Sequence, residues 1–368
     1  MSRPALIAVV FLGLTCSFAG QTSPARNDGI TLLGIFSSPS DVKDTRTHCQ
    51  RLRDFFDSSA KEHNLVGERP AVCDKVVNVV AGRGDAFLQE LNTNVRAAKL
   101  AIDSRHRILV TEPSTRSVHI FDFLNRKYTK IDGAIDDRLH FPYGVAVDAK
   151  DNIYVTDLRR GTIAVFNSDG KFERDIGDYK GEQAFEQPNS IAIDSDSGKI
   201  YVADSKRHFV LVLDREGKKI VSIGKRGGGI GPAQFRLPTD LALHGQELFV
   251  LDKKNQRIQV FDLNGHFKRE IKTEMLGTDA PRGMAIDSHG RIYVLLNVGM
   301  IQVLNPLGEP LFQFGNYGTG AAEFKDAAGI SIDPQDRLYV SDTGNQRVQI
   351  FQVTSQANPS DSPSASRR

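Results

Sequence analysis

Residues 338–351 read LYVSDTGNQRVQIF, two short apolar runs that flank a polar stretch rich in turn-forming residues. Residues 248–261, LFVLDKKNQRIQVF, repeat the pattern almost letter for letter. Runs of this length, rich in Val, Ile, Leu and Phe and broken by Asp, Asn and Gly, predict two β-strands joined by a tight turn. The chain therefore contains at least one internal repeat of a strand–turn–strand unit.

The same pattern occurs six times. The other copies are at 108–121, 153–166, 200–213 and 292–304. A shorter apolar segment precedes each copy, and these segments end at 103, 148, 194, 244, 287 and 333, at intervals of 45, 46, 50, 43 and 46 residues. A fourth apolar run follows most copies, such as KKIVSIG at 218–224. Four short strands repeated at this period are typical of the blades of a β-propeller. We expect an all-β, six-bladed propeller of four-stranded antiparallel blades.

The sixth unit lacks its fourth strand, because the chain after residue 353 turns into a Ser- and Pro-rich stretch that cannot form one. An open ring would leave an unpaired sheet edge. Residues 74–84, DKVVNVVAGRG, resemble the fourth-strand pattern of 218–227. The sequence therefore predicts that an N-terminal strand at 74–84 closes the ring, with a propeller over 72–353 and a disordered tail over 354–368.

The N-terminus has the pattern of an export signal. One Arg precedes a short apolar run, and small residues follow it, so residues 1–19 are expected to be a secretory signal peptide. This predicts an exported protein, periplasmic or secreted. An uncleaved anchor and a lipid anchor at Cys16 are the alternatives.

Residues 20–71 are expected to form a small N-terminal extension with a short helix within 37–64. An oxidising compartment would permit a disulfide between Cys49 and Cys73. Two buried free thiols are the other interpretation of these cysteines.

The composition of the chain excludes few classes of function. The chain has 368 residues, 25% of them charged, and a formal net charge of +2. Bulk charge therefore favours neither nucleic acid nor a membrane surface, and any such interaction must depend on a local patch.

The units resemble NHL repeats. The resemblance lies in a proline ahead of the first strand, an Asp at the end of the second strand, and an Asn-Gln-Arg stretch before the third. The matching residues are Pro142, Pro188, Pro238, Pro281, Asp157, Asp204, Asp252, Asp342, 255–257 and 345–347. Glu112 and Leu296 replace the Asp in the first and fifth units. An exported, bacterial type of NHL propeller is implied, and the family hosts both binding modules and a few enzymes. We expect the repeated Asp and Arg to hydrogen-bond turns or neighbouring blades.

An enzyme on this scaffold would place its groups at the mouth of the central channel, where the first strands begin. Aligning the units puts six residues in one ring there: Ala98, Tyr143, Asn189, Thr239, Arg282 and Ala328. The next ring is Lys99, Gly144, Ser190, Asp240, Gly283 and Gly329. One carboxylate and two cations are expected to face each other at this level.

Two classes of propeller enzyme indicate which metal ligands an active site at this mouth would need. Amidating lyases of this propeller class hold zinc through histidines near these rings, but none of the nine histidines falls in either one. Calcium-dependent lactonases need several oxygen ligands in the channel, and Asp240 with Asn189 are too few. We therefore expect no metal and no cofactor.

A cluster of basic residues is the stronger indication of function. Cations cluster in loops on one face, from the second to the fourth unit. They are Arg159, Arg160, Lys206, Arg207, Lys253, Lys254 and Arg257, with Lys225 and Arg226 nearby. Such a surface attracts an anionic partner, unless the adjacent Asp residues neutralise it.

The export signal and the lack of interleaved aromatic residues argue against RNA. The sequence predicts a monomeric, non-catalytic binding or scaffold propeller that engages a protein or anionic ligand on this face. The alternative is a lyase or lactonase acting at the channel mouth around Tyr143, Asn189, Thr239, Asp240 and Arg282.

Overall fold

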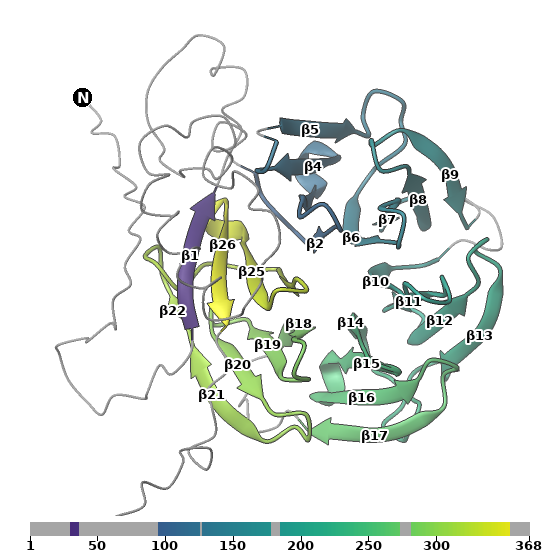
Figure 1. Cartoon of the computed structure of the whole chain (residues 1–368). Helices are drawn as coiled ribbons and strands as arrows, with labels where there is room; N and C mark the ends of the chain where they lie inside the picture. The colour runs from purple at the N-terminus through teal and green to yellow at the C-terminus, as the bar shows by residue number, and fades with distance from the viewer. Residues whose placement is uncertain (1–29, 37–94, 126, 178–184, 273–280, 354–368) are drawn as a thin grey trace, which may run out of the picture.

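The fold is a ring of six four-stranded antiparallel sheets around one axis (Figure 1). The computed structural model describes residues 30–36, 95–125, 127–177, 185–272 and 281–353, of which the side chains of 30–36 and of Val353 are not described. Neighbouring blades contact each other through their first strands, and these contacts run all the way round the ring. The predicted all-β, six-bladed architecture is confirmed.

Blades 1 to 3 follow one another along the chain, each running from the axis outward. Their strands are β2 (Leu100–Ile102), β3 (Ile108–Glu112), β4 (Ser117–Asp122), β5 (Lys127–Asp132), β6 (Pro142–Val147), β7 (Ile153–Asp157), β8 (Thr162–Phe166), β9 (Phe172–Ile176), β10 (Pro188–Ile193), β11 (Ile200–Asp204), β12 (Phe209–Leu213) and β13 (Lys219–Gly224).

Blades 4 to 6 continue the ring. Their strands are β14 (Pro238–His244), β15 (Glu247–Asp252), β16 (Arg257–Asp262), β17 (Phe267–Lys272), β18 (Pro281–Ile286), β19 (Ile292–Leu296), β20 (Ile301–Leu304), β21 (Pro310–Phe314), β24 (Gly329–Ile332), β25 (Arg337–Asp342), β26 (Arg347–Val353) and β1 (Ile30–Phe36). The short strands β22 (Asn316–Tyr317) and β23 (Glu323–Phe324) pair in the loop between blades 5 and 6. Single 3-10 turns, η4 (Pro113–Thr115), η5 (Lys253–Asn255) and η7 (Thr343–Asn345), link second and third strands.

The strand that completes blade 6 comes from the N-terminal part of the chain, as expected, but from a different segment. β1 pairs antiparallel with β26, from Ile30 opposite Val353 to Phe36 opposite Val348. The prediction that 74–84 fills this position is wrong, and 74–84 itself lies outside the described residues. The run ITLLGIF has the apolar, β-branched character of a strand, and it occupies the one edge of β26 that an otherwise complete ring leaves open.

Each hydrophobic cluster of the described residues spans the joint between two neighbouring blades. The cluster at the joint of blades 2 and 3, for example, combines Tyr154 and Val165 from blade 2 with Ile191 and Val202 from blade 3. Burying one such side chain contributes roughly 1.5–3 kcal/mol. A blade buries its two faces only against its neighbours, and for this reason the sequence repeats the unit.

The repeated aspartates hold the loops between blades, as the sequence suggested. Asp342 is fully buried and accepts hydrogen bonds from the Lys325 backbone at 2.7 Å, from the Asn345 amide at 2.8 Å and from Arg347 Nε at 2.7 Å. Arg347 continues to loop carbonyls, including that of Glu323 at 2.9 Å. Asp157, Asp204 and Asp252 accept backbone N–H groups of their own loops in the same way. Each Asp therefore works as a latch, by which we mean a buried carboxylate that binds the incoming loop.

Several sequence predictions fall outside the described residues. They are the signal peptide at 1–19, the helix within 37–64, the anchor at Cys16, the Cys49–Cys73 disulfide and the tail after 353. In the part of the chain that the structure does describe, no helix has the length and apolar character needed to cross a bilayer.

Candidate functional site

Residues at the channel mouth are set in place by β-bulges. In blades 2 to 5 the register with the second strand shifts directly after the proline that opens the first strand. Asn189, Thr239 and Arg282 are the extra residues of three of these bulges, and Tyr143 lies in the fourth. A bulge leaves a residue outside the ladder and redirects its side chain. The first strands β6, β10, β14 and β18 surround the axis (Figure 1), so four blades deliver their bulged residues to one place.

A buried ion pair crosses the axis just below the mouth. Lys99 Nζ from blade 1 donates to Asp240 Oδ2 from blade 4 at 2.9 Å, and both side chains are less than a tenth exposed. Asp240 also accepts from Ser190 Oγ at 2.8 Å and from the Met284 backbone at 2.9 Å. Gly283 makes room for the pair, because a Cβ there would lie 3.0 Å from Asp240 Oδ2. Blades 1 and 4 are opposite each other in a six-membered ring, so the ion pair forms a floor to the mouth.

Above this floor the positive charge is not balanced. Neither the Arg282 guanidinium nor the Lys253 ammonium has an ion-pair partner among the described residues. Burial lowers the pKa of Lys253, and repulsion from Arg282 and Lys99 lowers it further. Both cations are therefore close enough to interact, and an anion placed between them would relieve the repulsion.

The mouth also contains polar atoms without partners. Thr239 Oγ1 and Asn189 Oδ1 are buried and make no hydrogen bond within the described residues. Thr239 is 9% exposed and precedes Asp240 in β14. Buried polar atoms are normally hydrogen-bonded, so such a pair marks a place where a ligand or water supplies the missing partner. We define the channel mouth by Tyr143, Asn189, Thr239, Lys253 and Arg282.

Two cations of the predicted basic face have structural roles. Arg257 is buried and forms ion pairs with Asp252 at 3.0 Å and Glu270 at 2.8 Å. Arg160 pairs with Asp175 at 2.9 Å. Both guanidinium groups also donate to loop carbonyls. These two arginines hold loops and contribute little free charge.

The other predicted cations are more open. Lys206 and Arg207 share one carboxylate, Glu186, at 3.5 and 3.4 Å. Arg159 is exposed and lies over the Phe141 ring at 5.5 Å. Lys254 is exposed beside Lys253. The free basic surface is thus smaller than predicted and continues into the channel mouth through Lys253.

One cluster in the described part of the chain has the composition of a metal site, but its ligands are already used. Asp287, His289 and Asp336 bring their ligand atoms within 4.8 Å of one another. Asp287 accepts from Arg291 Nε at 2.5 Å and from the Tyr293 hydroxyl at 3.0 Å, as well as from two backbone N–H groups. Its carboxylate therefore has no free position for a cation, and the cluster acts as an ionic contact between blades 5 and 6.

Sequence reasoning placed Lys99 and Asp240 at one level but did not identify their direct bond. The feature of the sequence that could have indicated this bond is the equivalent position of the two residues in opposite blades. Lys253 was predicted as part of the basic face. Its backbone N–H donates to the Leu237 carbonyl at 3.2 Å, two residues before Thr239, so it also lies beside the start of β14 at the mouth.

Comparison with known proteins agrees with this architecture. A family profile described as "6-bladed beta-propeller" matches residues 143–208 and 196–294, and the NHL repeat profile matches 324–351. The chain is a six-bladed β-propeller, and its last blade matches an NHL repeat. Mouse NHL repeat-containing protein 3 is 28% identical to this propeller over 232 residues, which are 57% of this chain and 66% of the mouse protein.

Other relatives carry enzyme names. Rat peptidylglycine alpha-amidating monooxygenase is 29% identical over 150 residues, 38% of this chain but only 15% of the rat protein. Drosophila melanogaster peptidyl-alpha-hydroxyglycine alpha-amidating lyase 1 is 29% identical over 154 residues, 38% of this chain and 28% of the fly protein.

Among solved structures, a gluconolactonase from Xanthomonas campestris superposes with a TM-score of 0.54 at 17% identity, covering 70% of this chain and 87% of the lactonase. At that identity the similarity shows the fold alone.

Proposed function

We propose that this propeller is a non-catalytic binding module that takes an anionic group, a carboxylate of a protein or small ligand, at the channel mouth. The observation that carries the proposal is the unbalanced pair of cations, Lys253 and Arg282, beside the unpartnered Thr239 and Asn189. The exposed cations Arg159 and Lys254 extend this surface on the same face.

The charge distribution favours an anion over a cation or a neutral group. Lys99 is neutralised by Asp240, so the remaining charge of the mouth is that of Lys253 and Arg282. Hydrogen bonds between ionised partners are about twice as strong as neutral ones. A guanidinium offers a planar fork that matches a carboxylate, while an ammonium acts as a point charge. The Thr239 hydroxyl can donate a further hydrogen bond to the bound oxygen.

The alternative is a propeller enzyme of the lyase or lactonase type acting at the same mouth, and the names of the amidating relatives favour the lyase type. The donor set of the mouth argues against metal-assisted chemistry. Asp240 is the carboxylate of the two rings and already accepts three hydrogen bonds. A catalytic zinc site needs three converging protein ligands, and neither ring contains a histidine.

The export signal expected from the sequence would place the partner outside the cytoplasm. A propeller whose channel mouth is built on adjacent strands suits recognition of an acidic loop or a chain end of another protein. It equally suits a small carboxylate, so the test below uses one probe of each kind.

Calorimetric titration with succinate and with a tetraglutamate peptide tests the proposal. We expect binding that weakens as ionic strength rises. The double substitution Lys253→Gln with Arg282→Gln should weaken it at least tenfold, or about 1.4 kcal/mol. The control Lys218→Gln with Lys219→Gln removes the same charge from exposed positions near the outer strand of blade 3 and should bind normally.

Two results would overturn the proposal. One is equal loss of binding in both double variants, which would indicate a general charge effect. The other is stoichiometric zinc or calcium in protein purified without chelators, lost on substitution of Asp240, which would support the enzyme instead.

A further inference from the structure

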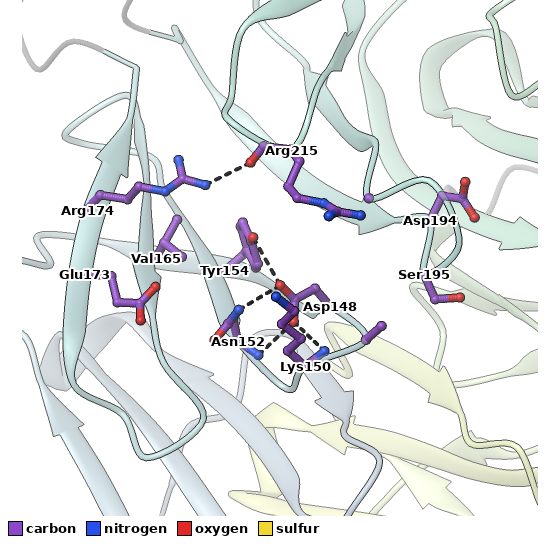
Figure 2. A pocket seen from close by; sticks show the side chains of 12 residues that line it. Asp148, Lys150, Asn152, Tyr154, Val165, Glu173, Arg174, Asp194, Ser195 and Arg215 are labelled. Atoms are coloured by element: carbon purple, nitrogen blue, oxygen red, sulfur yellow. Dashed lines mark hydrogen bonds between the residues drawn. The ribbon is translucent and has the colours of Figure 1, made fainter.

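A polar cavity lies at the joint between blades 2 and 3, on the face opposite to the basic loops. Its volume is about 180 Å³, room for roughly six water molecules at their liquid volume of about 30 Å³ each. Figure 2 shows the residues around it. Its lining includes Ala149 and Lys150 from blade 2 and Gly198 and Arg215 from blade 3.

At two other joints the same place is closed by a side-chain contact. In the turn after the first strand, Asp151 in blade 2 and Asp336 in blade 6 adopt left-handed backbone conformations, with φ of 61° and 57°. Asp151 accepts from the backbone N–H and the hydroxyl of Ser104 in blade 1, at 2.9 and 2.8 Å. Asp336 does the same with Ser288 of blade 5, at 2.8 and 2.6 Å. We call this Ser–Asp contact the clasp.

At the joint of blades 2 and 3 neither clasp residue is present. The position of the serine is taken by Ala149, and the left-handed residue of the facing turn is Gly198, with φ of 72°, in a turn one residue longer than those of blades 2 and 6. Both residues line the cavity. The cavity therefore occupies the space that the clasp fills at the joints of blades 1 and 2 and of blades 5 and 6.

A second contact between blades, a hydrogen bond from a tyrosine hydroxyl, is also absent at this joint. At the joint of blades 3 and 4, the Tyr201 hydroxyl donates to the Leu263 carbonyl of the neighbouring turn at 2.8 Å. The equivalent carbonyl at the joint of blades 2 and 3 is that of Arg215, and Arg174 Nη2 donates to it at 2.9 Å (Figure 2). The Tyr154 hydroxyl is left with a long contact to Asp148, 3.3 Å, and is available to a ligand.

The lining is polar but electrically balanced. Three cations, Lys150, Arg174 and Arg215, face three carboxylates, Asp148, Glu173 and Asp194. Within the described residues, the Glu173 carboxylate and the Lys150 ammonium form no ion pair with any group. The balance gives no net attraction for a small ion. The Asp148 carboxylate already accepts hydrogen bonds from its own turn, so Glu173 is the more open acceptor, and Tyr154 and Val165 are the buried residues of the lining.

We propose that this cavity binds a neutral, polyhydroxylated ring, that is, one sugar unit. A hydroxyl can donate to a carboxylate and accept from a cation at once, so neighbouring hydroxyls match a lining that offers both kinds of group. The C–H face of the ring fits the apolar floor, where the Tyr154 ring offers both an apolar body and a polar tip. The proposal is independent of the channel mouth, which lies on the other face.

Saturation-transfer NMR tests the proposal, with methyl α-D-glucoside, methyl β-D-galactoside and N-acetylglucosamine as probes and glycine and acetate as charged controls. We expect transfer to at least one of the sugars and to neither charged control. The double substitution Ala149→Ser with Gly198→Asp adds two side chains to the cavity, where the new Cβ at position 198 displaces the Arg215 guanidinium, and should abolish the transfer. Asp is among the residues that tolerate the left-handed conformation.

Two variants make the test specific. Gly290→Asp introduces the same residue at the same left-handed position of blade 5, where φ is 77°, and should leave transfer unchanged. Tyr154→Phe removes only the hydroxyl and should weaken transfer, which keeps the test valid even if the double variant does not fold.

Three results would overturn the proposal. They are the absence of transfer to all three sugars, transfer that persists in the folded double variant, and transfer to glycine in preference to the sugars.

Discussion

Glu112 shows how one residue adapts the repeated latch. It stands where other blades have Asp and accepts the Arg96 backbone N–H at 2.9 Å, as the aspartates do for their loops. Its longer side chain also contacts His119 Nε2 at 2.9 Å, and His119 Nδ1 contacts the Tyr128 hydroxyl at 2.8 Å. In blades 4 and 6 a glutamine occupies the position of His119. Blade 1 therefore keeps the latch with a different set of partners.

Acid should weaken the protein through Glu112. Burial by itself would raise the pKa of this carboxyl, but hydrogen bonds from His119, the Arg96 backbone and Thr115 outweigh it and lower the pKa to about 2 from 4.5. A lowered folded pKa gives stability that is present above about 4.5 and is lost as the pH falls toward 2. The shift corresponds to about 3 kcal/mol.

Glu112→Gln should therefore lower the free energy of unfolding at neutral pH and flatten its pH dependence in that acid range. Urea unfolding at a series of pH values measures both effects. An unchanged acid slope in the variant would contradict this role of Glu112.

The Asp–Arg latches predict a large effect of a single truncation. Asp342→Ala would leave Arg347 and the loop N–H groups without their partner in a buried site, a loss of about 3–5 kcal/mol. Arg159→Ala, which removes an exposed guanidinium on the same face, should change stability by less than about 0.5 kcal/mol. Equal melting temperatures for the two variants would refute the latch.

At the scale of the elements, the sequence encodes most strands but not the pairing of the last one. Second and third strands such as LFVL and IQVF are buried on both faces, so they are continuous apolar runs that are easily recognised. Outer strands such as β17 are half exposed. Charged residues stand between their apolar residues, so the apolar pattern of these strands is weak. Because 30–36 and 74–84 both resemble an outer strand, sequence alone could not decide which one pairs with β26.

Removing β1 should open the ring. A chain truncated to begin at residue 37 leaves the edge of β26 unpaired, so we expect a lower melting temperature and aggregation. A chain beginning at residue 29 retains the strand and serves as the control. Light scattering during a thermal melt distinguishes them, and coincident curves would show that β1 does not close the propeller.

The two candidate sites differ in how far the sequence predicts them. The channel-mouth residues could be aligned because each follows a proline and a repeated strand. Which cations stay free could not be predicted, since Arg257 and Arg160 are neutralised by Glu270 and Asp175 from other strands of their blades. The cavity between blades 2 and 3 was missed, because its signal is the absence of a clasp Ser and Asp from two adjacent turns, where Ala149 and Gly198 stand instead.

At the scale of the whole molecule, six blades converge on one axis, and opposite blades meet there. The Lys99–Asp240 pair removes one positive and one negative charge, so the mouth keeps the charges of Lys253 and Arg282. A rigid ring holds these two cations together at a cost in repulsion. A bound anion would offset this cost.

The most direct test is an NMR titration of the Lys253 ammonium, assigned with the Lys253→Arg variant, with and without succinate. A lysine with a lowered pKa loses its proton earlier as the pH rises, so Lys253 should titrate below the exposed lysines of the chain. Succinate should move the pKa of Lys253 upward and leave the others unchanged. A Lys253 that titrates like the exposed lysines and does not respond to succinate would contradict an anion site at the channel mouth.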